Sequence, residues 1–397
     1  MNILEEIQNC PVEWKELGEI SQFYSGLTGK TKSDFENGNA KYVTYKNIFN
    51  NIQVEFNLLE TVQVDKNERQ NFIEYGDVLI TGSSESKEEV GMSSTVTFVP
   101  DEQIYLNSFS FGIRFNEDIE LLPEFTKYLF RSIRLRKQIE KTASGVTRYN
   151  ISKVTFKKIK VPLLPLEIQE KIVQILDKMT EYVTELTSEL TSRKKQYSFY
   201  RDKLLSFEDE VYQVEWKTLG EIAENLDNMR KPVAKGGRSL GIYPYYGASG
   251  IVDYVDSFIF DGDYLLISED GANLVVRKTP IAFSISGKTW VNNHAHVLKF
   301  DNIINQKFVN YYLNYLDLSP YISGAAQPKL NQQNLNNIKI PYPSLEIQSR
   351  IVHVLDNFDT VCNDLNIGLP KEIELRQKQY EYFRDKLLTF VAEGEYT

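Results

Sequence analysis

The chain repeats itself, and this repetition constrains its fold more than any other feature of the sequence. The string VEWKELGEI at residues 12–20 returns as VEWKTLGEI at residues 214–222, with a single difference. Two further segments recur in the same order: IKVPLLPLEIQEKIVQILD (159–177) as IKIPYPSLEIQSRIVHVLD (338–356), and RKKQYSFYRDKLLSF (193–207) as RQKQYEYFRDKLLTF (376–390). Two matched halves on one chain predict an internal pseudo-two-fold, like a homodimer fused end to end.

The segments between the repeats differ in length and sequence. The offset is 202 residues from Val12 to Val214 but 179 from Leu166 to Leu345. Constant frames around variable centres indicate two reading modules on a repeated scaffold, and duplex DNA is a ligand with two related halves. An old duplication whose surface loops have drifted is the alternative.

Length and composition set broad limits. A chain of 397 residues is long enough for two domains and connecting helices. It has no run of about 18 apolar residues and no basic, apolar leader, so we expect neither a membrane span nor a signal peptide. Cys10 and Cys362 offer no disulfide framework, which fits a reducing cytoplasm.

The formal net charge of −10 argues at first against nucleic-acid binding. Its distribution points the other way, because residues 127–160 carry eleven Lys or Arg and one acid. Residues 228–252 and 271–300 each carry four basic residues and no acid. Local positive surface neutralises phosphates, so these patches favour DNA, although an ordinary mixed surface is the alternative.

Hydrophobic patterns predict mixed α/β modules at residues 12–160 and 214–340. Gly76-Asp77 and Gly262-Asp263 each open an apolar run that reads as a buried strand. Residues 105–115 alternate like one strand, with Phe109, Phe111, Ile113 and Phe115 on one face, and residues 290–300 alternate similarly. Residues 123–140 and 308–316 have helical spacing.

A long helix follows each module. Apolar residues recur at spacings of three and four from about Leu166 to Phe207 and again from about Leu345, the mark of a helix-packing seam. Gly368 and Pro370 predict a break in the second helix. The two helices would pair antiparallel, and forty residues give a rod of roughly 60 Å. Eight of these apolar residues are candidates for the packing seam of the two helices: Ile168, Ile172, Met179, Leu186, Ile347, Ile351, Phe358 and Leu365.

The enzyme motifs in the sequence are incomplete. Gly29-Lys30-Thr31 and Gly287-Lys288-Thr289 resemble the end of a phosphate-binding P-loop, but both lack the upstream glycine. No G-x-G-x-x-G element is present. His294 and His296 alternate as metal ligands could, but their counterparts in the first half are Phe109 and Phe111, which favours packing positions.

The signals that remain are for binding. Small-residue loops at 144–150 and 323–331 carry Arg, Asn, Gln and Lys, which contact phosphates and base edges. Tyrosine-rich segments at 45–47 and 245–249 and nearby basic residues form a second group, for which ordinary packing is the alternative. The candidate DNA-binding residues are Lys30, Thr31, Tyr45, Lys46, Asn47, Ser144, Thr147, Arg148, Tyr149, Asn150, Lys153, Tyr245, Tyr246, Ser249, Arg277, Lys278, Lys288, Gln327, Lys329 and Asn331.

These repeated motifs resemble those of the specificity subunit of type I restriction-modification enzymes. The resemblance covers nearly the whole chain and rests on the duplicated VEWK-x-LGEI openings, the LEIQ-x-x-IV-x-x-LD helix starts, the loop YYGASG at 245–250 and the tail ELRQKQYEYFRDKLLTF. It implies two target-recognition domains (1–165 and 208–344) and two spacer helices (166–207 and 345–392, broken near 366–371). The helices would form an antiparallel coiled-coil spacer between the tandem domains.

The resemblance also implies a non-catalytic subunit. Each recognition domain would read one half of an interrupted site in double-stranded DNA, and the spacer would dock two modification (methylase) subunits. S-adenosylmethionine, ATP and Mg²⁺ would belong to the methylase and restriction subunits, so no cofactor or metal is expected on this chain. A specificity subunit of a related system with cleavage fused to the methylase, a methyltransferase or nuclease with degenerate motifs, and a coiled-coil protein-binding scaffold are the alternatives.

Overall fold

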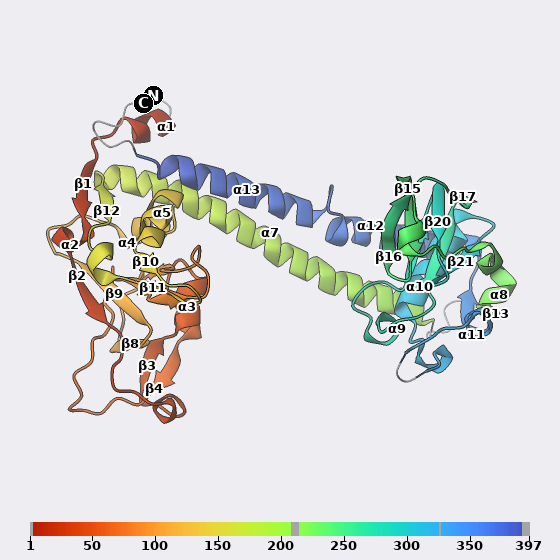
Figure 1. The fold of residues 1–397 in the computed structure, drawn as a ribbon, viewed down its shortest axis with the longest axis horizontal. Coiled ribbons are helices and arrows are strands. Elements are labelled where there is room, and N and C mark those ends of the chain that lie inside the picture. The colour runs from red at the N-terminus through yellow and green to blue at the C-terminus, as the bar shows by residue number, and fades with distance from the viewer. Residues whose placement is uncertain (1–2, 208–213, 325–326, 391–397) are drawn as a thin grey trace. The chain divides into compact units, whose positions relative to one another are not determined.

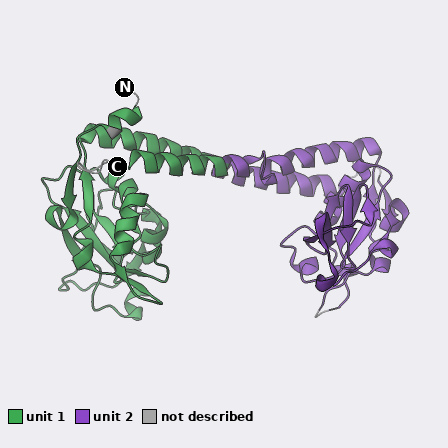
Figure 2. Cartoon of the chain, turned by 45° about the horizontal axis from the view of Figure 1, so that its top comes forward, with its two compact units in different colours: residues 1–185, 373–397 green, residues 186–372 purple. Residues whose placement is uncertain are grey.

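The computed structural model describes residues 3–207, 214–324 and 327–390, which form two compact units (Figure 2). The first unit spans residues 1–185 and 373–397, and the second spans residues 186–372. The expected start of the second recognition domain (208–213), two residues of the second small-residue loop (325–326) and the expected end of the second spacer helix (391–392) lie outside the described residues.

The first unit contains a domain with two main sheets (Figure 1). One has the order β2-β9-β5-β7, and the other has the order β4-β3-β8. The strands are β2 (Ser21–Ser25), β9 (Ser110–Phe115), β5 (Val78–Thr81), β7 (Ser93–Thr95), β4 (Glu60–Val62), β3 (Ala40–Val43) and β8 (Ile104–Leu106). All four residues of β5 are buried, as expected for a continuous apolar run at the centre of a sheet.

Smaller elements complete this domain. Strands β10 (Ala143–Ser144), β11 (Tyr149–Ile151) and β6 (Ser83–Ser84) form a short sheet, and β1 (Glu13–Glu16) pairs antiparallel with β12 (Lys160–Leu163). The helices are α1 (Ile3–Gln8), α2 (Leu17–Ile20), α3 (Tyr45–Asn50), α4 (Pro123–Leu129), α5 (Ile133–Lys141) and α6 (Lys153–Phe156).

The second unit repeats this plan. Its sheets have the orders β14-β21-β18-β19 and β16-β15-β20-β17. The strands are β14 (Glu224–Asn225), β21 (Ala295–Lys299), β18 (Tyr264–Ser268), β19 (Ala282–Ile285), β16 (Gly250–Val255), β15 (Leu240–Gly247), β20 (Lys288–Val291) and β17 (Phe260–Asp261). The pair β13 (Glu215–Thr218) and β22 (Lys339–Tyr342) matches β1 and β12, and the helices are α8 (Leu219–Ile222), α9 (Asn273–Val276), α10 (Ile303–Tyr315) and α11 (Gln332–Asn336).

Three longer helices carry the second and third repeats. They are α7 (Leu166–Ser206), α12 (Leu345–Asn363) and α13 (Leu369–Leu387). The first unit holds α13 residues beside the first half of α7, and the second unit holds α12 beside the second half. Each unit therefore takes its helix pair from two distant parts of the sequence.

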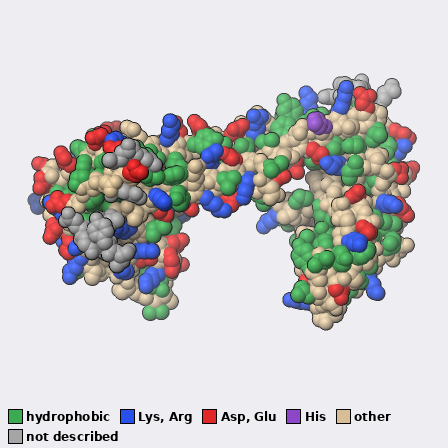
Figure 3. Space-filling model, turned by 90° about the horizontal axis from the view of Figure 1, so that it is seen from above, with side chains coloured by type: hydrophobic (Ala, Val, Ile, Leu, Met, Phe, Trp, Pro, Cys, Tyr) green, Lys and Arg blue, Asp and Glu red, His purple; other side chains and the backbone are tan. Residues whose placement is uncertain are grey.

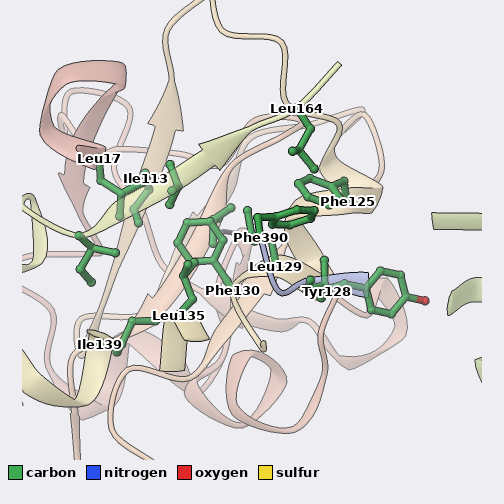
Figure 4. Close-up of a cluster of buried hydrophobic side chains, with 14 of the residues drawn as sticks. Leu17, Ile113, Phe125, Tyr128, Leu129, Phe130, Leu135, Ile139, Leu164 and Phe390 are labelled. Atoms are coloured by element: carbon green, nitrogen blue, oxygen red, sulfur yellow. The ribbon is translucent and has the colours of Figure 1, made fainter. Parts of the chain in front are cut away.

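The C-terminal repeat helps to build the core of the first unit. Leu387, Leu388 and Phe390 are at most 2% exposed and belong to the same cluster as residues of α4 and α5. Figure 4 shows Phe390 among Phe125 and Leu129. In the second unit, Leu205 from the matching repeat is fully buried in that unit's own core.

Three sequence expectations need correction. Residues 105–115 are two strands, β8 and β9, separated by a turn at residues 107–109, and residues 290–300 are divided in the same way at 292–294. The predicted helix 123–140 is also two helices. Ser132 separates them because its side chain accepts a hydrogen bond from the backbone of Leu135 and so caps α5.

No helix within the described ranges is both long and apolar enough to cross a membrane.

Candidate nucleic-acid interface

Each unit ties its small-residue loop to the end of its central strand. In the first unit, β11 pairs with β6 and with β10, so Asn150 lies opposite both Ser83 and Ser144. In the second, Lys329 forms the matching bridges to Asp270 and Ser323. The backbone therefore holds the two candidate loops in equivalent places within their units.

The first loop presents a row of exposed polar side chains. Ser144, Thr147, Arg148 and Asn150 are exposed, and Tyr149 is half-buried. The guanidinium of Arg148 donates to the hydroxyl of Ser83 at 3.0 and 3.2 Å, which orients it without neutralising its charge. The loop requires glycine at its start, because Gly145 has a φ of 145° and an added Cβ would lie 2.0 Å from a backbone oxygen of the loop.

Tyr45, Lys46 and Asn47 open helix α3 next to this loop. The Tyr45 hydroxyl donates to the carbonyl oxygen of Ser83 at 2.8 Å, and Lys46 is exposed. Asn47 is 1% exposed. Its side-chain amide donates to the carbonyl oxygen of Glu55 and accepts from the backbone N–H of the same residue. Asn47 therefore fixes the following loop, and its predicted contact with DNA stays untested.

Three other predicted residues of this unit lie elsewhere on the domain. Lys30 is ion-paired with Glu68, and only 6% of its side chain is exposed. Thr31 is exposed and caps a short 3-10 helix. Lys153, at the start of α6, is exposed with its ammonium 5.2 Å from the Phe111 ring centroid.

The second loop carries Gln327 and Lys329 as exposed side chains. The Lys329 ammonium lies 3.1 Å from a carboxylate oxygen of Glu269. Asn331 is the N-cap of α11, since its side chain accepts from the backbone of Asn334 at 2.8 Å. Only Gln327 and Lys329 of this group present exposed side chains at the loop.

A buried charged network supports the second loop and was not predicted. His296 is completely buried, with Nδ1 2.6 Å from a carboxylate oxygen of Asp227 and Nε2 2.7 Å from the carbonyl oxygen of Leu330. Both ring nitrogens therefore face oxygen atoms that can accept a hydrogen bond. Arg230 pairs with Asp227 and Glu269, which links this ring to Lys329.

The carboxylates of this network are held in their charged forms. Burial favours the neutral form of Asp227, but the hydrogen bond and charge of His296 outweigh burial and lower the pKa of Asp227. Burial is likewise outweighed at Glu269, where Arg230, His296 and Lys329 lower the pKa. Sequence reasoning missed this network because its members come from separate segments.

The tyrosine-rich segment of the second unit is partly internal. Tyr245 is 1% exposed, and its hydroxyl accepts from the backbone N–H of Val233 at 3.0 Å. Tyr246 is half-buried against Phe283, and Ser249 is exposed in the turn between β15 and β16. Ser249 alone of the three candidates has an exposed side chain.

Of the remaining basic candidates, one binds backbone groups inside the unit and two are exposed. The guanidinium of Arg277 donates to the carbonyl oxygens of Leu274, Leu313 and Leu316, so it caps the C-terminal end of α10. Lys278 and Lys288 are exposed. Burial lowers the pKa of Arg277, consistent with this internal role.

The basic stretch 127–160 also has internal members. Arg131 donates to the carbonyl oxygens of Ser93 and Ile48, and burial lowers its pKa to about 10. Arg136 binds backbone carbonyls and Lys127 pairs with Asp177. The exposed positive charges are Lys137, Lys141, Arg148, Lys153, Lys157, Lys158 and Lys160. Figure 3 shows such cations interspersed with acids over both units.

Each domain is fastened to its helix pair by the same bond. Tyr128 of α4 donates to Asp177 of α7 at 2.6 Å, and Tyr311 of α10 donates to Asp356 of α12 at 2.7 Å. A lysine joins each carboxylate, Lys127 at 2.8 Å in the first unit and Lys307 at 2.6 Å in the second. Burial and the carboxylate raise the pKa of both tyrosines, so they act as donors.

The eight predicted spacer residues occupy different environments. Ile168, Ile172 and Ile351 are buried in the cores of their own units, Leu186 is 9% exposed and Ile347 packs against the second core. Leu365 is 71% exposed in the segment between α12 and α13. Their docking of a partner stays a prediction.

Some matched positions of the helix pairs hold side chains of different size, and Met179 and Phe358 are one such pair. In the first unit Met179 lines a groove of about 650 Å³ with Ile175, Tyr182 and Phe383. In the second, the matching Phe358 stacks on Tyr197 and Tyr200, with ring centroids 6.0 and 5.7 Å away. The larger ring thus occupies space that methionine leaves open.

Within the described residues, no group of three or more His, Cys, Asp or Glu is arranged to hold a metal ion. Of the two histidines weighed as ligands, His296 is fully buried and bonded on both nitrogens, as a packing position requires. His294 is half exposed, which the packing interpretation did not predict.

The chain matches the family model for the type I restriction modification DNA specificity domain twice, over residues 11–193 and 213–375. Among curated relatives, a putative type I restriction enzyme specificity subunit of Haemophilus influenzae is 39% identical over 193 residues, which is 48% of this chain and 49% of that protein. The EcoR124I/EcoR124II specificity subunit of Escherichia coli is 36% identical over 60% of this chain and 65% of its own length. The EcoprrI specificity subunit is 28% identical, with 92% of each chain covered.

Solved structures have the same fold. A type I restriction-modification S subunit from M. genitalium superposes with a TM-score of 0.55 at 18% identity, covering 97% of this chain and 98% of that one. The specificity-subunit structure from Thermoanaerobacter tengcongensis gives 0.51 over 95% of each chain. The mixed α/β class with two tandem domains is thus confirmed. The chain belongs to the type I restriction modification DNA specificity family and carries two copies of its domain.

Proposed function

We propose that this chain is a DNA sequence-recognition subunit in which each unit reads one half of an interrupted site. One observation carries the proposal. Two loops of different sequence, with exposed Arg, Lys, Asn and Gln side chains, are held by equivalent backbone pairing in the two units. Repeating the scaffold while changing the side chains is what reading two different sequences requires. The family to which the chain belongs supports this interpretation.

Affinity and selectivity come from different side chains. Exposed cations such as Arg148, Lys153 and Lys329 contact phosphates and fix the register. Asn150 and Gln327 carry amides that can pair with adenine edges. The Tyr–Asp bonds hold each domain on its helices, so the helices set the spacing between the half sites.

The chain itself performs no chemistry in this proposal. Its helix pairs dock two methylase subunits, which bind S-adenosylmethionine and methylate adenine, and restriction subunits add the ATP- and Mg²⁺-dependent steps in the cytoplasm. Extrusion of the target adenine from the duplex is then a task of the methylase.

The test maps N6-methyladenine by single-molecule sequencing in a methylation-free host. The chain is expressed with its neighbouring methylase, and a matched strain lacks the chain. An interrupted two-part motif that needs this chain supports the proposal. A motif that is absent, or that persists without the chain, contradicts it and favours a protein-binding scaffold.

A further inference from the structure

Both units expose a ring at the same point of the fold, where the chain leaves one sheet and enters the other. Phe109 lies in the turn between β8 and β9 and is 66% exposed. His294 lies in the turn between β20 and β21, with 52% of its side chain exposed. The sequence pattern had placed Phe109 on a packed strand face, so this exposure is a finding of the structure.

A buried asparagine fixes each turn. The side-chain oxygen of Asn107 accepts from the backbone N–H of Phe109 and from the hydroxyl of Ser110, both at 3.0 Å. The same oxygen of Asn292 accepts from the backbone N–H of His294 at 2.8 Å. Both asparagines are less than 10% exposed. These local bonds replace the strand ladder and hold the turn in one conformation.

Backbone hydrogen bonds place each turn beside the candidate loop. Gly82 donates to the carbonyl oxygen of Phe109 at 2.8 Å and accepts from the N–H of Ile151 at 2.9 Å. In the second unit, Glu269 donates to His294 at 2.9 Å and accepts from Leu330 at 2.8 Å. One residue therefore separates the exposed ring from the loop strand in both units.

An apolar ring in this position needs an explanation. A phenylalanine left in water forgoes the stabilisation that burial gives, and the Phe109 ring is exposed on a turn that Asn107 holds. Rigidly held aromatic rings beside cationic loops contact nucleic acid by stacking on bases, by wedging between base steps or by touching the thymine methyl group.

The exposed ring of the second unit, His294, has a nitrogen atom placed for a polar contact. Nδ1 of His294 lies 2.8 Å from a carboxylate oxygen of Asp270, which orients the ring. Among the described residues, its Nε2 has no hydrogen-bond partner. This nitrogen can therefore bond an outside group, and the polar edge of a base is a suitable one.

We propose that Phe109 and His294 are equivalent base-contacting residues of the two units. Phe109 makes an apolar contact in one half site, and His294 makes a hydrogen bond through Nε2 in the other. The inference rests on the proposed function and adds to it one contact position per unit with a different chemistry in each half. It predicts that each substitution affects one half site alone.

The experiment uses the purified complex of the full chain with its methylase and duplexes carrying the mapped motif. Affinity is measured at fixed salt for the full site and for duplexes with either half replaced. Phe109→Ala should weaken binding to the full site about tenfold or more and should remove discrimination in one half only. Phe109→Trp should restore most of the affinity, and His294→Ala should affect only the other half.

The matched control is Leu58→Ala, which removes another exposed apolar side chain of the first unit, itself 55% exposed. It should bind like the unsubstituted complex, and all variants should keep its melting temperature. A change of less than about twofold for Phe109→Ala, an equal loss in both halves, or an equal loss for Leu58→Ala overturns the assignment. If the unsubstituted complex itself prefers no sequence, the proposed function fails as well, so the two failures are distinguishable.

Discussion

The two units hold equivalent loops on the same backbone ladder but secure them with different side chains. In the first unit the loop cation, Arg148, bonds a neutral serine hydroxyl. In the second, Lys329 pairs with Glu269, which belongs to a buried network with Arg230 and His296. The same strand pairing therefore holds the loop in both units, although the side chains around it differ. Variation of half-site chemistry without loss of the fold follows from that division.

The helix pairs show the reverse pattern. The hydrogen bond from tyrosine to aspartate that attaches each domain to its helices is the same in both units. The lysine that pairs with the aspartate differs in position: Lys127 directly precedes its tyrosine, and Lys307 lies four residues before its own. The helices also differ in side-chain size at some matched positions, such as Met179 and Phe358. What is preserved here is the attachment, which sets how each domain is presented.

The largest effect on stability should come from removing a large buried side chain from the core of one unit. Phe390→Ala removes a ring that is 2% exposed in the first core and should lower that unit's free energy of unfolding by about 3–5 kcal/mol. Leu205→Ala should destabilise the second unit instead, by about 2–5 kcal/mol. Hydrogen exchange of the full chain reads each unit separately. Equal loss of protection in both units from either variant would contradict two independent cores.

The charged network predicts a smaller effect confined to the second unit. Asp227→Asn keeps the size of the side chain but leaves His296 without its carboxylate, and should cost about 3 kcal/mol at neutral pH. Thermal or chemical unfolding of the full chain measures this cost, and Ser83→Ala in the first unit should cost less than about 1 kcal/mol.

The pH dependence of this variant has a defined sign. The pKa of Asp227 is lowered by folding, so its contribution to stability is present above the unfolded-state pKa of about 4. That contribution is lost as the pH falls through the folded-state value. The difference between the wild-type chain and Asp227→Asn should therefore shrink in acid, and a difference that grows would contradict the charged network.

The smallest effect should come from the attachment bonds. Tyr128→Phe and Tyr311→Phe each remove one hydrogen bond to a carboxylate that keeps its lysine, and each should cost about 1–2 kcal/mol. Exchange protection should fall at α4 in the first variant and at α10 in the second. Costs that differ by more than about 1 kcal/mol between the variants would show that the attachments are not equivalent.

Part of this organisation was predictable from the sequence. The repeats predicted two tandem mixed α/β domains, and the structural comparisons confirm that class. The alternation over residues 105–115 was misleading because it continues across the turn at Asn107, whose side chain binds the backbone and interrupts the strand. A period of two in apolar residues does not reveal such a turn.

The site was less predictable for a physical reason. Arg131 and Arg277 look like phosphate ligands in a sequence, but both bind backbone carbonyl oxygens at the ends of helices or loops. The network of Asp227 and His296 joins residues 69 positions apart, which no local pattern reports. Loop composition identified candidate cations, but it did not show which of them bind other groups of the protein.

The most direct test of two independent reading units exchanges one of them. Residues 214–340 are replaced by the corresponding segment of a relative with a different motif, and N6-methyladenine is mapped in the methylation-free host with the same methylase. If the units read independently, one half of the motif changes while the other half and the spacing remain. A change in both halves, or in the spacing, would contradict it.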